Sequence, residues 1–260
     1  MQDCKKSKPV FGLRFGMQTR SEVVQDVISC EIGLDFESRL IITPNVDHII
    51  TLHNNPEYRK ACEYAWKLTV DGFPVARFLR LVGVQIPERV TGADLFPEIM
   101  HALEPEKHRP CFLVATEHTR AFLVSWLSEH GFDSTNCLVA VPPFGFEKNE
   151  HISDQLVSEL GRINATHLFM GVGAPKSEVW AYRNRSRLNN VCVLCFGAGI
   201  EFFSGNLVRA PEWMQKFGFE WVWRLCSEPR RLARRYLVNS WKFFYYATKE
   251  IVRQKKGLGV

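Results

Sequence analysis

The sequence predicts an α/β protein in which a Rossmann-like, mostly parallel sheet carries helices on both faces. Short apolar runs alternate along the chain with segments of helical periodicity, which is the pattern of such folds. Most runs end in turns of Gly, Pro, Asn or Asp. Near residue 209 the composition changes, and Trp, Phe, Tyr and Arg become frequent. We therefore expect an α/β domain over residues 1–208 and a basic, aromatic, helical appendage over residues 209–260.

The strands follow from apolar, β-branched runs that stop at turn residues. They are expected within 39–45, 67–72, 109–116, 136–145, 165–178 and 190–199.

The helices follow from apolar stripes and end signals, and are expected at 21–32, 46–66 with an internal break, 73–83, 119–131 and 152–164. Ser21 is the expected N-cap of the first. Pro74 suits the first turn of its helix, and Gly131 closes another. In the appendage, short helices broken near Pro229 are expected.

Polar and glycine residues recur where these strands end. In parallel sheets, ligands bind beyond the carboxyl ends of the strands. The sequence therefore predicts one shared site, formed by Thr43 and Asn45, by Asp71 and Gly72, by residues 171–176 and by residues 197–201.

Asp71 is the strongest candidate for a catalytic residue in this group, because it follows the apolar run of residues 68–70 directly. A partly desolvated carboxylate there can take a proton from an attacking hydroxyl. The alternative is a turn residue that caps the helix starting at Phe73. Asp94 has the same two interpretations, and its neighbours Thr91 and Gly92 favour a helix start.

The loop "GVGAPKSE" (residues 171–178) matches neither the dinucleotide fingerprint nor the P-loop. Gly171 and Gly173 still allow a backbone to approach a ligand closely, and Lys176 can meet a phosphate. A purely structural turn is the alternative. The histidines show no metal-ligand spacing, and Cys192 and Cys195 lie in an apolar run that reads as a core strand. We expect neither a metal nor a cofactor.

The positive charge is concentrated in the appendage. Residues 209–256 hold twelve basic and four acidic side chains, a net of +8, whereas the chain totals +5. Basic residues beside Trp, Phe and Tyr are typical of a helix at an anionic membrane surface, and no run is long enough to span one. Docking on the protein core is the alternative. The acidic-leaning body argues against nucleic acid. The polar start predicts no export signal, hence a cytoplasmic protein with reduced thiols.

Several segments together resemble one family. They are "TPN", "VDGFPVARFLRLVGVQIPERVTGADLF", "GVGAPKSE" and, above all, "FGAGIEFFSGNLVRAPEWMQKFGFEWVWRLCSEPRRLARR". They resemble the WecG/TagA/CpsF glycosyltransferases of bacterial surface-polymer synthesis, over about residues 43–235. The resemblance implies an inverting, metal-independent transfer of a sugar from a UDP-sugar to a polyprenyl-diphosphate-linked glycan. It places the protein on the inner face of the cytoplasmic membrane, as a peripheral enzyme.

The resemblance also implies roles for individual residues. Asp71 matches the proposed general base, and Thr43 and Asn45 lie in the segment that lines the same pocket. Glu201 matches an acidic position of the nucleotide-sugar site, beside the loop of Gly171, Gly173 and Lys176. The appendage arginines that would close over the diphosphate are Arg224, Arg231 and Arg234.

The sequence departs from the family pattern at Val70, Ala115, Ser177, Cys195 and Glu201. These departures surround the expected nucleotide-sugar pocket, so they leave the donor sugar open. N-acetylmannosamine, its uronic acid, glucose and glucuronic acid are the candidates.

Three other interpretations remain at this stage. A nucleotide-sugar dehydrogenase or epimerase would need the complete glycine fingerprint, which is missing. An inactive, membrane-bound scaffold of a polysaccharide assembly complex is the main alternative in another class. The aromatic appendage could also pack on a second copy of the chain, giving a homo-oligomer.

Overall fold

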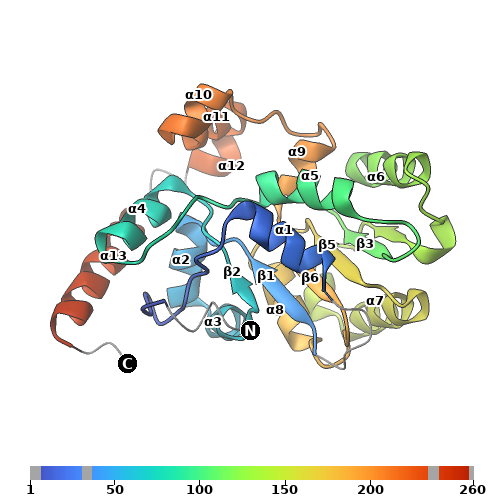
Figure 1. Ribbon diagram of the computed structural model, residues 1–260, viewed down its shortest axis with the longest axis horizontal. Coiled ribbons are helices and arrows are strands. Elements are labelled where there is room, and N and C mark those ends of the chain that lie inside the picture. Colours follow the sequence, from blue (N-terminus) through green and yellow to red (C-terminus); the bar gives the residue numbers. More distant parts are fainter. Residues whose placement is uncertain (1–6, 31–36, 234–239, 258–260) are drawn as a thin grey trace.

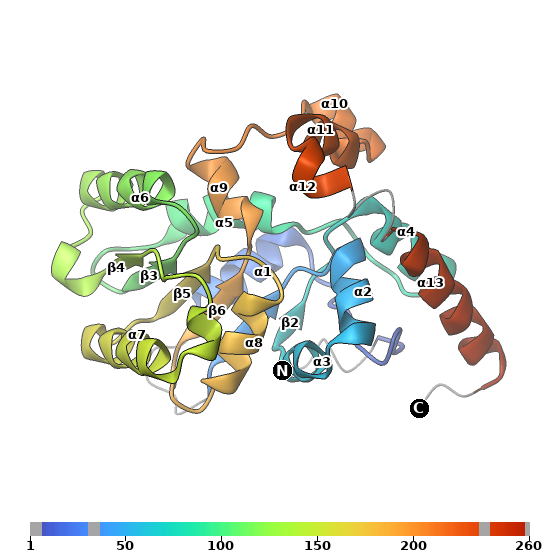
Figure 2. The same ribbon diagram turned by 180° about the vertical axis from the view of Figure 1, so that it is seen from behind.

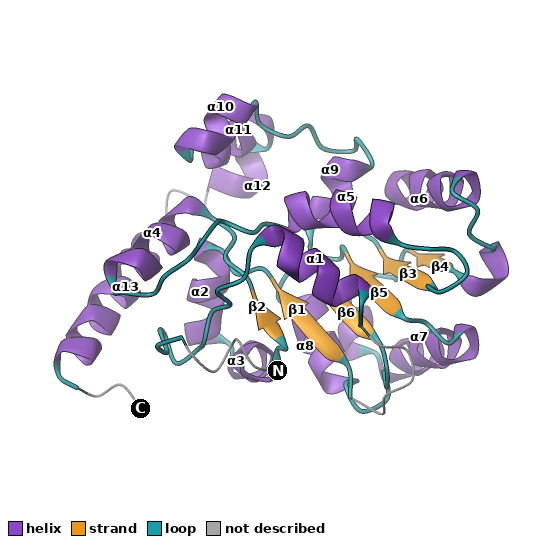
Figure 3. Cartoon of the chain, in the orientation of Figure 1, coloured by secondary structure: helices purple, strands orange, loops and turns teal. Residues whose placement is uncertain are grey.

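The computed structural model describes residues 7–30, 37–233 and 240–257. Its centre is a six-stranded, all-parallel sheet with strand order β2-β1-β6-β5-β3-β4 (Figure 3). The fold class predicted from the sequence is confirmed. The strands are β1 (Arg39–Ile42), β2 (Lys67–Leu68), β3 (Pro110–Leu113), β4 (Leu138–Ala140), β5 (His167–Met170) and β6 (Cys192–Cys195).

Helices cover both faces of the sheet, because its strands are apolar on both sides. In β1, Leu40 and Ile42 belong to one hydrophobic cluster and Ile41 to the other. Figure 1 views the face that α1 and α5 cover, and Figure 2 the opposite face. The helices on the first face are α1 (Arg20–Ile28), α5 (Gly92–Ala102), α6 (Glu117–Glu129) and α9 (Ala198–Phe203). Those on the second are α2 (Val46–Asn54), α3 (Pro56–Tyr64), α4 (Phe73–Leu81), α7 (Glu150–Ile163) and α8 (Lys176–Arg183).

The first helix begins earlier than predicted. Its N-cap is Thr19 and not Ser21, because Thr19 and Glu22 form a reciprocal capping box. Each side chain accepts a hydrogen bond from the other residue's backbone N–H, which satisfies two of the free donors at the helix start.

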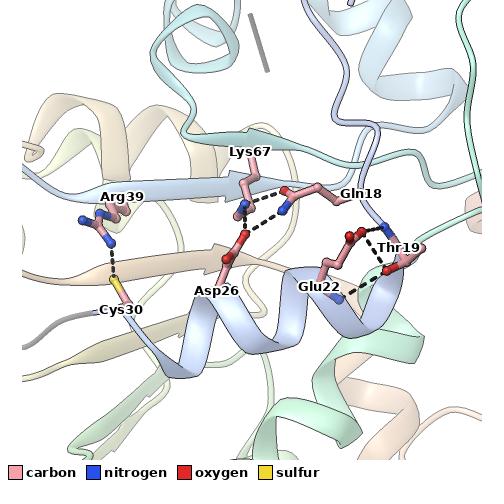
Figure 4. A network of polar contacts seen from close by, with 7 residues as sticks. All are labelled: Gln18, Thr19, Glu22, Asp26, Cys30, Arg39 and Lys67. Atoms are coloured by element: carbon pink, nitrogen blue, oxygen red, sulfur yellow. Dashed lines mark hydrogen bonds and ion pairs between the residues drawn. The ribbon is translucent and has the colours of Figure 1, made fainter. Parts of the chain in front are cut away.

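A polar network ties α1 to the sheet (Figure 4). The buried Lys67 ammonium of β2 lies 2.6 Å from a carboxylate oxygen of Asp26, and Gln18 contacts both. Just beyond the carboxyl end of the helix, the Arg39 guanidinium donates to the Cys30 sulfur at 3.2 Å. The helix is therefore fixed at both ends against strands β2 and β1.

Most other predicted elements are present, with shorter bounds. The expected break inside residues 46–66 falls at Asn55, which ends α2 and caps α3. Cys192 and Cys195 lie buried in β6, so the core-strand interpretation of this pair is confirmed. Helices α8 and α9 were not predicted as separate elements, because they start inside glycine-rich turns.

The appendage consists of α10 (Glu212–Phe217), α11 (Glu220–Ser227), α12 (Pro229–Ala233) and α13 (Ser240–Lys255). The predicted break near Pro229 is confirmed. Helix α13 packs beside α2 and α4 (Figure 2): Tyr246 stacks on His53 with ring centroids 3.8 Å apart, and Phe243 meets Phe78 at 6.1 Å. Over residues 7–30, 37–233 and 240–257, no helix is both long and apolar enough to cross a bilayer.

Candidate active site

A cavity of about 840 Å³ opens at the carboxyl ends of β1, β2, β5 and β6. The α/β domain forms its floor through the starts of α2 and α4, the segment before α5 and the turns after β5 and β6. The appendage forms the remaining wall, through Gln215, Gly218, Glu220, Trp221, Arg224, Phe243 and Phe244. The strand ends therefore meet at one cavity, as the sequence predicts. Residues of the appendage form part of its wall.

Asp71 lines this cavity, and its side chain is 30% exposed. Its backbone N–H donates to the Pro44 carbonyl, which holds the turn after β2 against the turn after β1. Helix α4 begins after Gly72, whose φ is +90°, and no described side chain caps it. Asp71 is therefore not the cap of α4, and its carboxylate lines the cavity instead.

The surroundings of Asp71 raise the pKa of its carboxyl to about 6. Burial is the largest cause, because a desolvated carboxylate is harder to ionise. Arg89 opposes this shift, Glu220 adds to it, and the more distant charges of His48 and Arg224 oppose it. A carboxyl with such a pKa is ionised at neutral pH and is a stronger base than an exposed aspartate.

Among the described residues, Arg89 forms the ion pair with Asp71, and sequence reasoning did not single it out. Its Nη1 lies 3.9 Å from Asp71 Oδ1 and 3.6 Å from Glu220 Oε2. Glu220 belongs to the first turn of α11, so this guanidinium connects the α/β domain with the appendage. Both residues stand inside the quoted family segments. The segment around Arg89, "IPERVTG", offered no signal beyond that resemblance, because the charged pair of Glu88 and Arg89 is typical of a solvated turn.

Asn45 and Thr43 also line the cavity. The Asn45 side chain caps α2 by accepting from the Asp47 N–H at 3.1 Å, and the Asn45 backbone N–H donates to His48 Nδ1 at 3.2 Å. His48 Nε2 then faces Glu178 Oε1 at 3.6 Å. His48 and Glu178 were not predicted from the sequence, because a lone histidine and the single acidic residue of a loop carry no pattern of their own.

Three other predicted residues point elsewhere. Gly171 lies under α9: a Cβ there would stand 3.2 Å from Ile200 Cδ1. The Lys176 ammonium sits 4.6 Å above the Phe144 ring and is not among the residues that line the cavity. Glu201 is buried and accepts from the Thr119 hydroxyl at 2.8 Å, which ties α9 to α6. Gly173, with φ of +89°, does line the cavity.

Arg224 is the predicted appendage arginine that reaches the cavity. Its guanidinium carbon lies 5.7 Å from the centroid of the Phe202 ring, and its buried Nε has no hydrogen-bond partner. Within the part of the chain that the structure describes, no carboxylate neutralises it. Arg231 lies in α12, but its side chain falls outside the described part, as does the whole of Arg234.

The described residues that line the cavity carry more negative than positive charge. They include two guanidiniums, on Arg89 and Arg224, together with the carboxylates of Asp47, Asp71, Glu178 and Glu220. Among the described residues, no group of three or more acidic, His or Cys side chains is arranged to hold a metal ion.

Asp94 takes the helix-start role that its neighbours favoured. Thr91 caps α5 and donates its hydroxyl proton to Asp94 Oδ2 at 2.8 Å. The other Asp94 oxygen binds Arg209 at 2.7 Å, at the start of the appendage. Asp94 therefore fastens the appendage to α5.

Comparisons with known proteins show which family and which relatives the chain resembles. A model of the glycosyl transferase WecG/TagA/CpsF family matches residues 8–257. Two relatives carry the name N-acetylglucosaminyldiphosphoundecaprenol N-acetyl-beta-D-mannosaminyltransferase. The relative from Bacillus spizizenii strain W23 is 25% identical over 194 residues, which cover 75% of this chain and 73% of that protein. The relative from Bacillus subtilis strain 168 is 26% identical over 164 residues, which cover 63% and 62%.

Proposed function

The chain belongs to the glycosyl transferase WecG/TagA/CpsF family, and we propose that it transfers a sugar from a UDP-sugar to a polyprenyl-diphosphate-linked glycan. The product would serve a bacterial exopolysaccharide, capsule or cell-wall polymer. The observation that carries the proposal is Asp71. It lies in the large cavity, caps no helix, and has a carboxyl pKa raised to about 6 by burial.

The chemistry is a single displacement with inversion. Asp71 accepts the proton of the acceptor hydroxyl while that oxygen forms a bond to the anomeric carbon. The bond from this carbon to UDP breaks on the opposite side, and negative charge develops on the β-phosphate. Guanidiniums stabilise that charge without a metal ion. Arg224, which lines the cavity, is proposed to take this role together with Arg231 and Arg234.

The relatives' names favour UDP-N-acetylmannosamine as donor and an N-acetylglucosaminyl diphosphate lipid as acceptor. The corresponding uronic acid, glucose and glucuronic acid remain donors to test, since the chain departs from the family pattern around the pocket. The appendage, residues 209–256, is proposed to rest on anionic headgroups at the inner face of the cytoplasmic membrane. That position would bring the cavity to a lipid-borne acceptor.

A UDP-release assay tests the proposal. Purified protein would be given each UDP-sugar in turn with a short-chain lipid-diphosphate-sugar acceptor. We expect acceptor-dependent release with one donor, and a loss of about a hundredfold or more in Asp71→Asn, because general-base catalysis is worth that much. UDP binding without release would point to a different acceptor. Absence of both would favour the inactive-scaffold alternative.

A further inference from the structure

One guanidinium stands between the candidate base and the appendage. Arg89 Nη1 lies 3.9 Å from Asp71 Oδ1 and 3.6 Å from Glu220 Oε2, so the two carboxylates compete for the same cation. The side chains of Arg89 and Glu220 are 23% and 21% exposed, which limits screening by water. Neither distance is that of a tight hydrogen bond, and the cation is therefore shared.

The position of Glu220 is fixed by the fold of the appendage. The turn before α11 contains Gly218, where an added Cβ would lie 2.8 Å from Phe73 Cγ at the start of α4. The Trp223 indole donates to the Val208 carbonyl at 3.0 Å. These contacts set the first turn of α11 against the rim of the cavity, with Glu220 facing Arg89.

We propose that Glu220 is a positioning residue for the reaction: it draws the Arg89 guanidinium away from Asp71 and so keeps the Asp71 carboxylate available as the base. This inference rests on the proposed function. It assigns the appendage a second task besides contact with the diphosphate or the membrane, namely the adjustment of the base.

The charges around Asp71 decide the direction of the effect. Arg89 faces it from the segment before α5, Glu220 and Arg224 from α11, and His48 from α2. Glu220 is the one of these four that raises the pKa of Asp71. Without Glu220, the carboxylate would lose a repelling charge and Arg89 would pair with Asp71 alone. Both changes stabilise the ionised form and make it a weaker base.

The same argument connects catalysis to the seating of the appendage. When α11 lies against the rim, Arg89 is shared and Asp71 is basic. If α11 moved away, Arg89 would lose Glu220 and pair with Asp71 alone. The Asp71 carboxylate would then be a weaker base. The site is then competent only while the appendage is in place.

The test is the pH dependence of Asp71, measured in two ways. The first is the pH–rate profile of UDP release. The second is a ¹³C NMR titration of aspartate carboxyls, in which the Asp71 signal is assigned by its loss in Asp71→Asn. In Glu220→Gln we expect the midpoint of both to move about one pH unit or more towards acid. The rate above pH 8 should fall about threefold, as expected for a weaker base.

Matched variants separate positioning from mere structure. Glu212→Gln makes the same charge change on α10, outside the cavity lining, and should leave the midpoint where it is. Glu220→Asp keeps the charge, and the titration midpoint of Asp71 should stay close to that of wild type. In an Arg89→Gln background, Glu220→Gln should shift the midpoint much less, because the shared cation is gone.

Three results would overturn the inference: an unchanged NMR midpoint in Glu220→Gln, an equal shift in Glu212→Gln, or a full shift that persists without Arg89. The NMR readout does not depend on turnover. A wild-type protein without transferase activity but with the expected NMR shifts would contradict the proposed function and still support the role of Glu220.

Discussion

At the scale of single residues, Asp71 is held where its charge is unfavourable. Its carboxyl has a pKa of about 6 in the folded protein, against a reference value of 3.8. Between these values the folded state binds the proton more strongly than the unfolded state does. The free energy of unfolding therefore falls as the pH rises through that window.

Asp71→Asn should consequently be more stable than wild type at pH 8, by up to about 3 kcal/mol, since one pKa unit corresponds to about 1.4 kcal/mol. The difference should shrink towards pH 4, where both proteins are neutral at this position. Urea unfolding at the two pH values would measure it. A variant that is less stable than wild type at pH 8 would show that the carboxylate supports the fold, as a helix cap does.

Arg231, in α12, is one of the appendage arginines that we propose to meet the donor diphosphate. The described lining has four carboxylates and two guanidiniums, so a further cation from Arg231 would favour a diphosphate there. Arg231→Ala should lower kcat/KM for the donor by about tenfold to a hundredfold, the worth of a charge-assisted hydrogen bond. Arg230→Ala, on the same helix and exposed, is the matched control. Equal effects of the two would mean that only net charge matters.

At the scale of elements, the sheet and most helices were predictable, since their signals are local. The strand runs, Pro74 in the first turn of α4 and the break near Pro229 all follow from neighbouring residues. The order β2-β1-β6-β5-β3-β4 was not predictable, because it depends on which face each connecting helix covers. The N-cap of α1 was misplaced, because Thr19 and Ser21 are chemically equivalent until Glu22 selects one.

The candidate site divides in the same way. Thr43, Asn45 and Asp71 could be predicted because each lies within three residues of the end of a strand. Arg89 and Glu220 could not be paired from the sequence, since they are 131 positions apart and meet only when the appendage folds back. The task of Glu201 as a tie between helices likewise depends on Thr119, in a distant segment.

The crossing of α5 and α9 is the contact between elements that is most sensitive to substitution. A Cβ on Gly199 would lie 2.8 Å from the Gly92 carbonyl carbon and 2.9 Å from the Ala93 nitrogen. These are backbone atoms, so the two helices would have to separate, and α9 begins at the cavity. Gly199→Ala should destabilise the protein by about 2 kcal/mol or more and lower donor affinity.

Gly161→Ala provides the control for that prediction. Gly161 lies inside α7 with nothing within 4 Å of an added Cβ. Alanine there should stabilise the protein by about 0.5 to 1 kcal/mol, because it restricts the unfolded chain and favours the helix. Thermal or urea unfolding of both variants would measure the contrast. Equal stability of Gly199→Ala and wild type would show that α5 and α9 can separate freely.

At the scale of the whole molecule, charge and exposed aromatics gather on one part of the chain. The appendage carries the net positive charge, and Trp241, Tyr245 and Phe217 are 74%, 63% and 69% exposed. Figure 1 shows α10, α11 and α12 grouped at the top of the view and α13 running beside α4. A surface of this composition suits the headgroup region of an anionic bilayer, where aromatic rings insert and basic side chains meet phosphates.

The protein should therefore sediment with vesicles of anionic phospholipid, and bind vesicles of phosphatidylcholine much more weakly. Binding should decrease as salt rises from 50 to about 500 mM, since screening shortens the reach of the charges. The double variant Trp241→Ser/Tyr245→Ser should bind about tenfold more weakly, through loss of buried apolar area. Val124→Ser, which changes an exposed apolar residue on α6, should bind as wild type does.

The same variants distinguish lipid from a second copy of the chain. If the aromatic surface meets another subunit, light scattering will show an oligomer that the double variant dissociates, and vesicles will retain neither protein. If the aromatic surface contacts lipid, the double variant will have the same molecular mass in solution as wild type. Only its binding to vesicles will be weaker. The membrane proposal requires the second pattern, because only a surface left free in solution can bring the cavity to a lipid-borne acceptor.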